Sequence, residues 1–320
     1  MSLTSTQKRS HFPRAAHLFW ILLLFIAARI CYYLLSDGFS LIKIENTFPI
    51  TAEWQLPPPN AKQLQQIEQI CSKPFSYLAK GSQAYAFISE DKKYVLKLFK
   101  CYHLSPVEWL ESLWLPPIID DMRNQAVRKR QKKISDTLQS YKIASQSLYD
   151  ECGLIAMEIL PTASFHQPIT IIDKIGRRHS IDLGDYGFII QRRADLIYPQ
   201  LSSWIASGEI DKAKEALSSI VALIVERSHK GIQDSDPDLH KNAGLIGTTA
   251  ILIDLGSLHR NSSAAKQAVF KSDLYKITNR LHEWLKKQSP ELDAYLQEQI
   301  QNSSSTKWHK VREWTEISER

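Results

Sequence analysis

The longest apolar stretch of the chain lies near its N-terminus. Leu18 to Leu35 (LFWILLLFIAARICYYLL) contains one charged side chain, Arg29. A helix of that length extends roughly 27 Å, close to the ~30 Å hydrocarbon core of a bilayer. Trp20, Tyr32 and Tyr33 stand near its two ends, where interfacial aromatic side chains gather. The pattern predicts one transmembrane helix over residues 18–35, which contacts membrane lipid.

A cleaved signal peptide is the alternative interpretation of the same stretch. Lys8, Arg9 and Arg14, in the tail 1–17, would be its basic region, and Leu18 to Ala28 its apolar core. Ile26 fits poorly to the small-residue cleavage pattern, and the apolar run resumes after Arg29. These two observations favour a retained, single-pass anchor.

The charges around the apolar stretch bear on its orientation. Three basic residues precede it and only Lys43 follows closely, so the positive-inside rule places the large domain on the non-cytoplasmic side. A nucleotide-dependent enzyme would lack its usual cofactor supply there. The side of the membrane therefore stays open at this point.

Residues 36–72 form a proline-containing connector, with a helix predicted over Ala61–Cys71. Beyond it, the period of the hydrophobic positions changes along the chain. Alternating or short apolar runs predict strands in residues 73–198, while residues 199–290 are largely of helical period. A strand-rich lobe followed by a reduced helical lobe makes an α+β fold. Residues 291–320 add a helix and a polar tail. The predicted strands are Phe75–Tyr77, Ala84–Ile88, Tyr94–Phe99, Gly153–Leu160, Ile169–Asp173, Arg178–Leu183, Gly187–Arg192, Ala243–Ile246 and Ala250–Leu255, and the longer helices are Gln125–Asp150, Ile210–Ser228, Ala264–Lys287 and Glu291–Gln301.

Composition and charge indicate a globular protein and argue against a nucleic-acid-binding chain. The 320 residues are 43% hydrophobic and 23% charged, which is ordinary for a globular protein. Six basic residues and no acid occur between Arg123 and Lys133, inside a net charge of +6. Such a local excess indicates either a solvated helix face or a contact with phosphate or lipid headgroups, and no nucleic-acid partner is expected. The four cysteines have no CxxC spacing, so a zinc site or disulfide framework cannot be argued from them.

Two segments of the strand-rich half have the chemistry of a phosphate site. Leu78–Phe87 (LAKGSQAYAF) is a tight turn between strands, and the backbone N–H groups near Gly81 and Ser82 can lie against phosphate oxygens. Tyr94–Lys100 (YVLKLFK) places Lys97 among apolar neighbours on one face of a strand. The alternatives are an ordinary hairpin turn and an edge-strand lysine in solvent.

Two further segments offer carboxylate and amide oxygens. Lys230–Asn242 (KGIQDSDPDLHKN) contains Asp236 and Asp238, either of which could accept a proton, and Asn242, whose amide oxygen suits a hard cation. Asp254 follows an apolar strand and precedes Leu255 and Gly256, and a strand–turn–strand separates it from Asn242. An acidic turn that caps neighbouring helices remains the alternative for the first of these segments.

In this order and spacing, the four segments resemble the signature set of the protein-kinase superfamily, over residues 73–290. The resemblance implies an ATP- and Mg²⁺-dependent phosphotransferase. It assigns nucleotide binding to Gly81, Ser82, Lys97 and Asn242, metal binding to Asn242 and Asp254, and the role of catalytic base to Asp236 or Asp238. The divergence is considerable, because alanines stand at two glycine places and Asn242 comes one residue later than the pattern allows.

Other departures keep three hypotheses open. The helix after Lys97 offers only Asp136, with Glu151 just beyond it, where kinases carry a glutamate partner for the lysine. No A-P-E sequence follows Asp254. The first hypothesis is a membrane-anchored phosphotransferase acting on an unknown small or lipid-linked acceptor. The second is a catalytically inactive pseudokinase that serves as a tethered binding protein, and the third is an unrelated α+β interaction protein.

Overall fold

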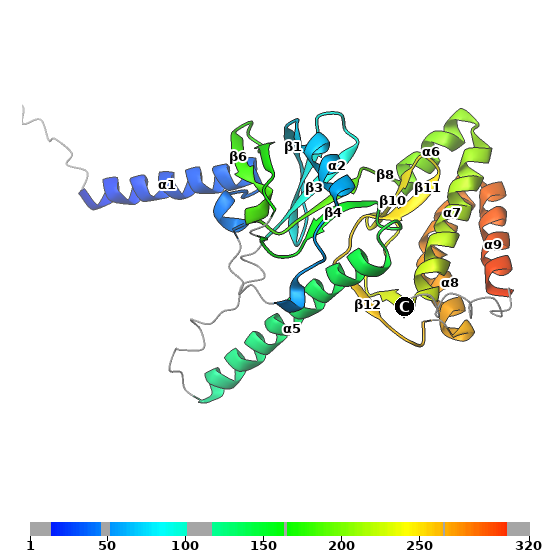
Figure 1. Cartoon of the computed structure of the whole chain (residues 1–320). Coiled ribbons are helices and arrows are strands. Elements are labelled where there is room, and N and C mark those ends of the chain that lie inside the picture. Colours follow the sequence, from blue (N-terminus) through cyan, green and yellow to red (C-terminus); the bar gives the residue numbers. More distant parts are fainter. Residues whose placement is uncertain (1–13, 46–51, 101–116, 163–164, 265, 306–320) are drawn as a thin grey trace, which may run out of the picture.

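The structure is a computed structural model that describes residues 14–45, 52–100, 117–162, 165–264 and 266–305. Helix α1 (Arg14–Ser36) projects away from the body of the molecule (Figure 1). Its part from His17 to Ser36 is long and apolar enough to cross a membrane, and its residues up to Leu35 are exposed apart from the half-buried Tyr32. The apolar helix predicted near the N-terminus is therefore present.

The strand-rich half is built around one seven-stranded sheet in the order β4-β7-β3-β2-β1-β5-β6. Neighbouring strands are antiparallel except β1 and β5, which run parallel. Hairpin β5–β6 therefore extends the sheet beyond β1. The strands are β1 (Phe75–Lys80), β2 (Ala84–Ser89), β3 (Tyr94–Phe99), β4 (Leu154–Glu158), β5 (Pro168–Ile172), β6 (Arg178–Asp182) and β7 (Phe188–Arg192).

The central strand β3 has a different core on each face. Leu96 and Leu98 pack into a cluster on one face of the sheet, together with Phe87. Phe99 belongs to the second, larger cluster, which the helices share. Because side chains alternate along a strand, Lys97 projects toward the helical side with Phe99. The alternation thus brings one lysine to the junction of the two halves.

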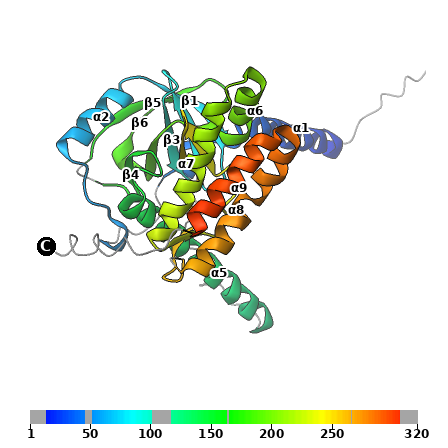
Figure 2. The same ribbon diagram turned by 90° about the vertical axis from the view of Figure 1, so that its right-hand side faces the viewer.

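The remaining elements form the helical half and its small strands (Figure 2). Helices α7, α8 and α9 lie side by side, and α5 runs from the body toward the side from which α1 projects. The helices are α2 (Ala61–Cys71), α5 (Pro117–Ser147), α6 (Ile197–Ser207), α7 (Ile210–His229), α8 (Gln267–Gln288) and α9 (Pro290–Ser305), and the strands are β8 (Asp195–Leu196), β9 (Ile232–Asp234), β10 (Ala243–Ile246), β11 (Thr249–Leu252) and β12 (Leu258–Arg260). Short 3₁₀ turns occur at Leu41–Lys43, Ala52–Trp54 and Leu183–Asp185.

The predicted α+β class is confirmed, with a strand-rich part followed by a helical part, an arrangement compatible with a two-lobed kinase-like domain. Most predicted elements occur within a few residues of their expected bounds. The structure adds α6 and the three-residue strands β9 and β12, and it starts α5 at Pro117 rather than Gln125.

Strand β4 ends in a buried acid. The Glu158 side chain is 4% exposed and accepts a hydrogen bond from Thr162 Oγ1 at 3.2 Å. Burial raises the pKa of Glu158 to about 7, because the charged form loses its hydration. Between its ordinary pKa and about 7, the folded chain keeps a proton that the unfolded chain has released. The stability contributed by this group therefore falls as the pH rises through that window.

Replacing Glu158 by glutamine removes this pH dependence, since the amide stays neutral. E158Q changes the free energy of unfolding at each pH. We expect this change to be about 2 kcal/mol more stabilising at pH 8 than at pH 5. Denaturant unfolding of the full chain at the two pH values measures the difference. The exposed Glu68 provides the matched control, E68Q. An equal effect of E158Q at both pH values would contradict the expectation.

Candidate active site at the junction of the two halves

Lys97 connects the sheet to the segment that follows β11. Its Nζ donates a hydrogen bond to the carbonyl oxygen of Ile253. Burial lowers the pKa of Lys97, and the charge of the neighbouring Asp254 acts in the opposite direction. Asp254 itself is exposed. A cation held beside an accessible carboxylate is an arrangement that can bind an anion and a metal ion together.

Asn242 and Asp254 lie close together because β10 and β11 form a tight antiparallel hairpin. Ala243 is registered opposite Leu252, so the residues just outside the hairpin also face each other. The Asn242 carbonyl oxygen accepts from the N–H of Ile253 at 2.9 Å and from that of Asp254 at 3.2 Å. The two residues predicted as metal ligands are thus neighbours in space.

Asp236 approaches the same place from the loop that precedes β10. The Asn242 Nδ2 donates to the Asp236 carbonyl oxygen at 2.7 Å and to its carboxylate Oδ2 at 3.2 Å. A turn closes the loop, since the Asn242 N–H donates to the carbonyl of Asp238 at 2.8 Å. Asn242 is 6% exposed. The extra residue in this loop therefore does not separate the side chains of Asp236 and Asn242.

Asp238, the other candidate base, is engaged elsewhere. Its carboxylate accepts from the N–H of His240 at 3.0 Å. It also forms ion pairs with Lys241 at 3.8 Å and with Arg280 at 3.5 Å. A carboxylate engaged by two cations and a turn is less available to hydrogen-bond an acceptor hydroxyl. The geometry favours Asp236 over Asp238 for that role.

The turn between β1 and β2 lies over the segment that contains Asp254. Gly81 and Ser82 are exposed at this turn. The next residue, Gln83, accepts a hydrogen bond from Tyr141 Oη at 2.6 Å. Its side chain also packs against Gly256, where a Cβ atom would lie 2.9 Å from the Gln83 Nε2. Only glycine fits at position 256 while Gln83 keeps this place.

Lys100 is a buried cation at the base of the same turn. It is 1% exposed, and its Nζ donates to the carbonyl oxygen of Gly81. The ammonium also lies 4.5 Å from the centre of the Tyr85 ring. Burial, helped by the positive charges of nearby lysines, lowers the pKa of Lys100 to about 8. A second cation thus fixes the backbone of the turn. Lys100 lies at the end of the predicted segment Tyr94–Lys100, but no sequence pattern assigned it a role.

Helix α5 is attached to the segment after Asp254 through a buried serine. The Ser140 hydroxyl donates to the carbonyl of Leu255 at 2.5 Å and accepts from the N–H of Leu258 at 2.6 Å. The next residue, Tyr141, stacks on Phe99 of β3 with ring centres 4.6 Å apart. These contacts fix α5, β3 and the segment containing Asp254 relative to one another.

The acidic residues considered as partners of Lys97 lie elsewhere. Asp136 is exposed on α5 and pairs with Lys132 at 3.3 Å. Glu151 pairs with Lys230. Within the described ranges, the carboxylate beside Lys97 is therefore Asp254, from the other half of the molecule. No group of three or more His, Cys, Asp or Glu side chains that could hold a metal occurs among the described residues, so a metal here would need other ligands.

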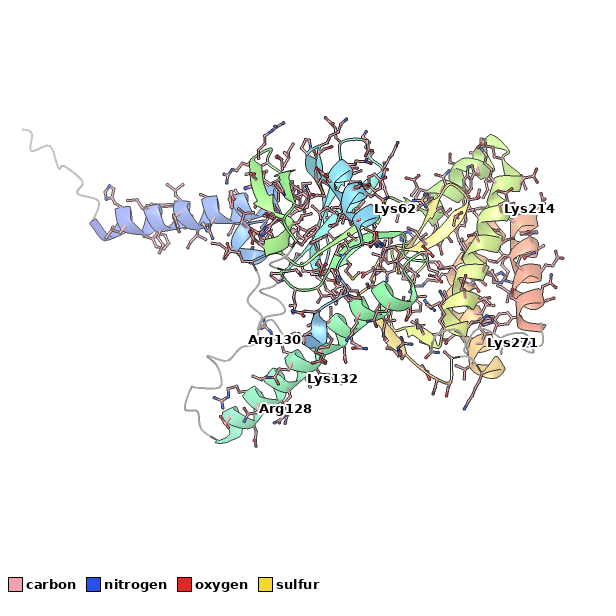
Figure 3. The ribbon with its side chains drawn as sticks, viewed as in Figure 1. Lys62, Arg128, Arg130, Lys132, Lys214 and Lys271 are labelled. Atoms are coloured by element: carbon pink, nitrogen blue, oxygen red, sulfur yellow. The ribbon has the colours of Figure 1, made fainter. Side chains whose placement is uncertain are left out.

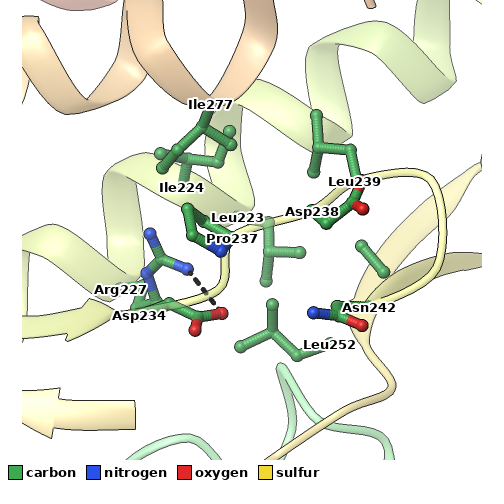
Figure 4. Close-up of a pocket in the computed structure, with 11 residues that line it drawn as sticks. Leu223, Ile224, Arg227, Asp234, Pro237, Asp238, Leu239, Asn242, Leu252 and Ile277 are labelled. Atoms are coloured by element: carbon green, nitrogen blue, oxygen red, sulfur yellow. Dashed lines mark ion pairs between the residues drawn. The ribbon is translucent and has the colours of Figure 1, made fainter. Parts of the chain in front are cut away.

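Asp234, whose ion pair with Arg227 is drawn in Figure 4, joins the loop before β10 to the segment after β11. Its carboxylate accepts from Ser257 Oγ at 2.5 Å and from the N–H of Asp236 at 2.9 Å. It also pairs with the buried Arg227 of α7 at 3.6 Å. Both side chains of the pair are nearly inaccessible, at 3% for Arg227 and 2% for Asp234. The pair borders a cavity of about 10 Å³, enough for about one water.

Taken together, the structure brings Lys97, Asp236, Asn242 and Asp254 to one place and lays the Gly81 turn beside them. Sequence patterns did not identify the side chains that hold this arrangement. These are Gln83, Lys100, Ser140, Arg227 and Ser257. The one local signal was Asp234, which stands at the histidine place of the kinase catalytic loop and could have suggested a structural partner nearby.

Comparisons with known proteins give a limited result. No protein-family model matches this sequence, and no curated protein matches it. The solved structures that resemble it include a high-resolution crystal structure of WbdD, with 17% identity and a TM-score of 0.32 over 71% of this chain and 46% of that one. Another is the structure described as the bifunctional kinase-methyltransferase WbdD, with 18% identity and a TM-score of 0.31 over 69% and 42%. The chain spans less than half of each WbdD chain, and so loose a superposition assigns no activity to it.

Proposed function

We propose that this chain is a membrane-anchored, kinase-like phosphotransferase that uses a nucleoside triphosphate and Mg²⁺. The observation that carries the proposal is the meeting of Lys97, from β3, with Asn242 and Asp254, from the two ends of the β10–β11 hairpin, at the junction of the two halves. One ammonium group and two oxygen ligands are what a metal-bound polyphosphate requires.

The order of the elements supports the same proposal. In protein kinases the phosphate-binding lysine is on the third strand, and the catalytic aspartate and metal ligands follow in a later loop and a D-x-G segment. Here Lys97 is on β3, α5 follows it, the loop with Asp236 lies between β9 and β10, and Asp254 follows β11. The resemblance stated from sequence thus extends to the placement of each motif on its element.

The donor set fits Mg²⁺ and ATP. The amide oxygen of Asn242 and the carboxylate of Asp254 are hard ligands, and Mg²⁺ usually takes one or two such protein ligands besides phosphate oxygens and waters. When bound, the ion neutralises developing charge on the transferred phosphoryl group. Lys97 would hold phosphate oxygens, and the backbone at Gly81 and Ser82 would cover them.

We assign the orientation of the acceptor to Asp236. Its carboxylate Oδ2 lies 3.2 Å from the Asn242 amide nitrogen, which positions it beside the proposed metal ligands. An acceptor hydroxyl hydrogen-bonded to this carboxylate would pass its proton to Asp236 as its oxygen attacks the γ-phosphorus, the bond to the β–γ bridging oxygen breaks and ADP leaves. The reduced helical half suggests a small or lipid-linked acceptor rather than a folded protein.

A pseudokinase that binds through the same fold is the second candidate. It is favoured by the position of Asp136 and Glu151, which leaves Lys97 without the glutamate partner of active kinases. The Gln83 side chain, packed on Gly256, also lies beside the proposed phosphate site. In this case the chain binds nucleotide, or a partner, without turnover.

Helix α1 supports the membrane part of the proposal. Its apolar side chains are exposed over the whole candidate span, and an apolar surface of that length is stable in lipid rather than in water. Arg29 carries the one charge in the predicted span, and its long side chain can reach toward the headgroups. We therefore place α1 across a bilayer.

Full-length protein in lipid nanodiscs with γ-labelled ATP tests the proposal. We expect Mg²⁺-dependent release or transfer of the label, abolished by EDTA, with a membrane-lipid extract, simple sugars and a generic protein offered as acceptors. Saturable nucleotide binding without turnover would support the pseudokinase instead. If the chain neither binds nucleotide nor transfers the label, the kinase-like proposal is wrong.

A further inference from the structure

Helix α1 is joined to the body by several polar contacts just beyond its C-terminal end. The Asp37 carboxylate accepts from Tyr77 Oη at 2.7 Å and pairs with Lys174 at 2.9 Å. The Tyr85 hydroxyl donates to the carbonyl of Gly38 at 3.0 Å. These partners come from β1, β2 and the β5–β6 turn. Because the sheet holds the end of α1, a membrane around α1 would face a defined surface of the body.

Basic and apolar side chains surround this junction. Lys80 Nζ donates to Tyr33 Oη at 2.9 Å, and Arg177 Nη1 donates to Tyr32 Oη at 3.3 Å. Both cations are exposed, as is the side chain of Ile42 at 75%. Tyrosine, arginine, lysine and exposed isoleucine together are typical of protein surface at the depth of lipid headgroups.

The N-terminal part of α5 reaches the same side of the molecule. In Figure 1, α1 runs to the left of the body, and α5 slants down and to the left. The free end of α5 extends in Figure 1 at least as far toward the membrane side as the junction of α1 with the sheet. A bilayer that encloses α1 would therefore lie within reach of the start of α5.

The N-terminal half of α5 is strongly basic beyond its first turns, which carry Asp120 and Asp121 (Figure 3). Arg128 lies roughly 16 Å along the helix from its start. Arg128, Lys129 and Lys133 are exposed and form neither a hydrogen bond nor an ion pair with the described part of the chain. Lys132 is also exposed, although it pairs with Asp136 at 3.3 Å. Residues 123–133 contain no acid. We call the exposed cations from Arg128 to Lys133 the α5 basic tip.

We propose that the α5 basic tip docks on anionic lipid headgroups of the leaflet from which α1 emerges. This inference rests on the proposed membrane anchoring by α1, and is independent of phosphotransfer. Lys and Arg side chains near a negatively charged bilayer are attracted to it, and the attraction decays within a Debye length, roughly 8 Å at physiological ionic strength. Only a tip held near the surface, as α5 is, benefits from it.

The proposal also bears on the side of the membrane. Anionic lipids give the cytoplasmic leaflet its negative surface potential, so the basic tip favours a domain on that side. This orientation is opposite to the one favoured by the basic tail before α1. It would give the domain access to the nucleotide pool that a phosphotransferase needs.

Lysine footprinting of the full-length protein in nanodiscs tests the docking. A water-soluble acetylating reagent is applied to protein in phosphatidylcholine alone and in phosphatidylcholine with phosphatidylserine, and each lysine is followed by mass spectrometry. We expect Lys129, Lys132 and Lys133 to react several-fold more slowly with phosphatidylserine present, and high salt to restore their rates. Lys62 and Lys271, exposed elsewhere on the body, are internal controls and should keep their rates (Figure 3).

Two outcomes would overturn the proposal. One is equal reactivity of the tip lysines in both lipid mixtures, and the other is a uniform slowing of the tip and control lysines together. Inorganic phosphate added to phosphatidylcholine nanodiscs should not protect the tip, and protection by it would identify a soluble phosphate site instead. Resistance of the protein to alkaline carbonate extraction is measured in parallel, so that a failure of α1 to anchor is distinguished from a failure of the tip to dock.

Discussion

Replacing Asp254 by asparagine is expected to reduce Mg²⁺-dependent phosphoryl transfer by about 10²–10³-fold, the usual cost of removing one preorganised charge-stabilising group from an active site. The carboxylate lies beside Lys97 and next to Asn242, so its loss removes the proposed charged oxygen ligand while leaving the hairpin backbone in place. The measurement is kcat/KM for transfer to the acceptor found by screening, or for ATP hydrolysis when water is the acceptor.

Asp238 provides the matched control. It is four residues before Asn242, but its carboxylate is held by Lys241 and Arg280, away from the site. We expect D238N to change kcat/KM by less than about threefold, as most ion pairs exposed to solvent contribute little. A D254N protein that stays folded and fully active, or a D238N protein that loses activity as D254N does, would contradict the assignment of roles.

Replacing Arg227 by leucine is expected to destabilise the fold by about 3–5 kcal/mol, because it leaves the Asp234 carboxylate buried without its cation. Both side chains of the pair are almost fully inaccessible. Asp234 also connects the loop before β10 to Ser257, so its protonation or displacement would disturb the proposed active site as well. Denaturant unfolding of the full chain, compared with the natural sequence, measures the loss.

A double-mutant cycle separates the lost pair from lost packing. We expect R227L combined with D234N to be more stable than R227L alone, since the neutral amide removes the uncompensated buried charge. The exposed Arg280 gives a control, and R280L should change the stability by less than about 1 kcal/mol. Strict additivity of R227L and D234N would mean that the two charges do not interact in the folded chain.

The parts of the fold with a strong local period could be predicted from sequence. Side chains alternate between the two faces of a strand, which was enough to place Lys97 of strand β3 on the face it shares with Phe99. The residues between Asn242 and Asp254 read as two strands joined by a glycine turn, and a hairpin necessarily brings its two ends together. The meeting of these two residues therefore followed from local pattern alone.

Other parts depend on contacts between distant residues. Helix α6 contains Pro199 and three serines and was not predicted, although a proline in the first turn of a helix is tolerated. Strands β9 and β12 have three residues each and exist through their pairing with each other. Likewise, nothing local in α5 indicates that Ser140 contacts the backbone of Leu255.

The distinction between Asp236 and Asp238 also needed the structure. By sequence, both lie near the spacing that separates a kinase catalytic aspartate from its asparagine. The turn that hydrogen-bonds the Asn242 N–H to the carbonyl of Asp238 absorbs the extra residue and leaves Asp236 beside the asparagine amide. Loop conformation of this kind is set by backbone hydrogen bonds that no residue count reveals.

The most direct test of the account is affinity acylation with an acyl-phosphate derivative of ATP, which transfers its acyl group to a lysine lying against the bound phosphates. Burial lowers the pKa of Lys97, which increases the share of reactive neutral amine. We expect Lys97 to be the principal acylated residue in the full-length protein, with labelling that needs Mg²⁺ and is blocked by excess ATP. Acylation spread over surface lysines such as Lys62 and Lys271, without protection by ATP, would contradict the central claim that Lys97, Asn242 and Asp254 form one nucleotide site.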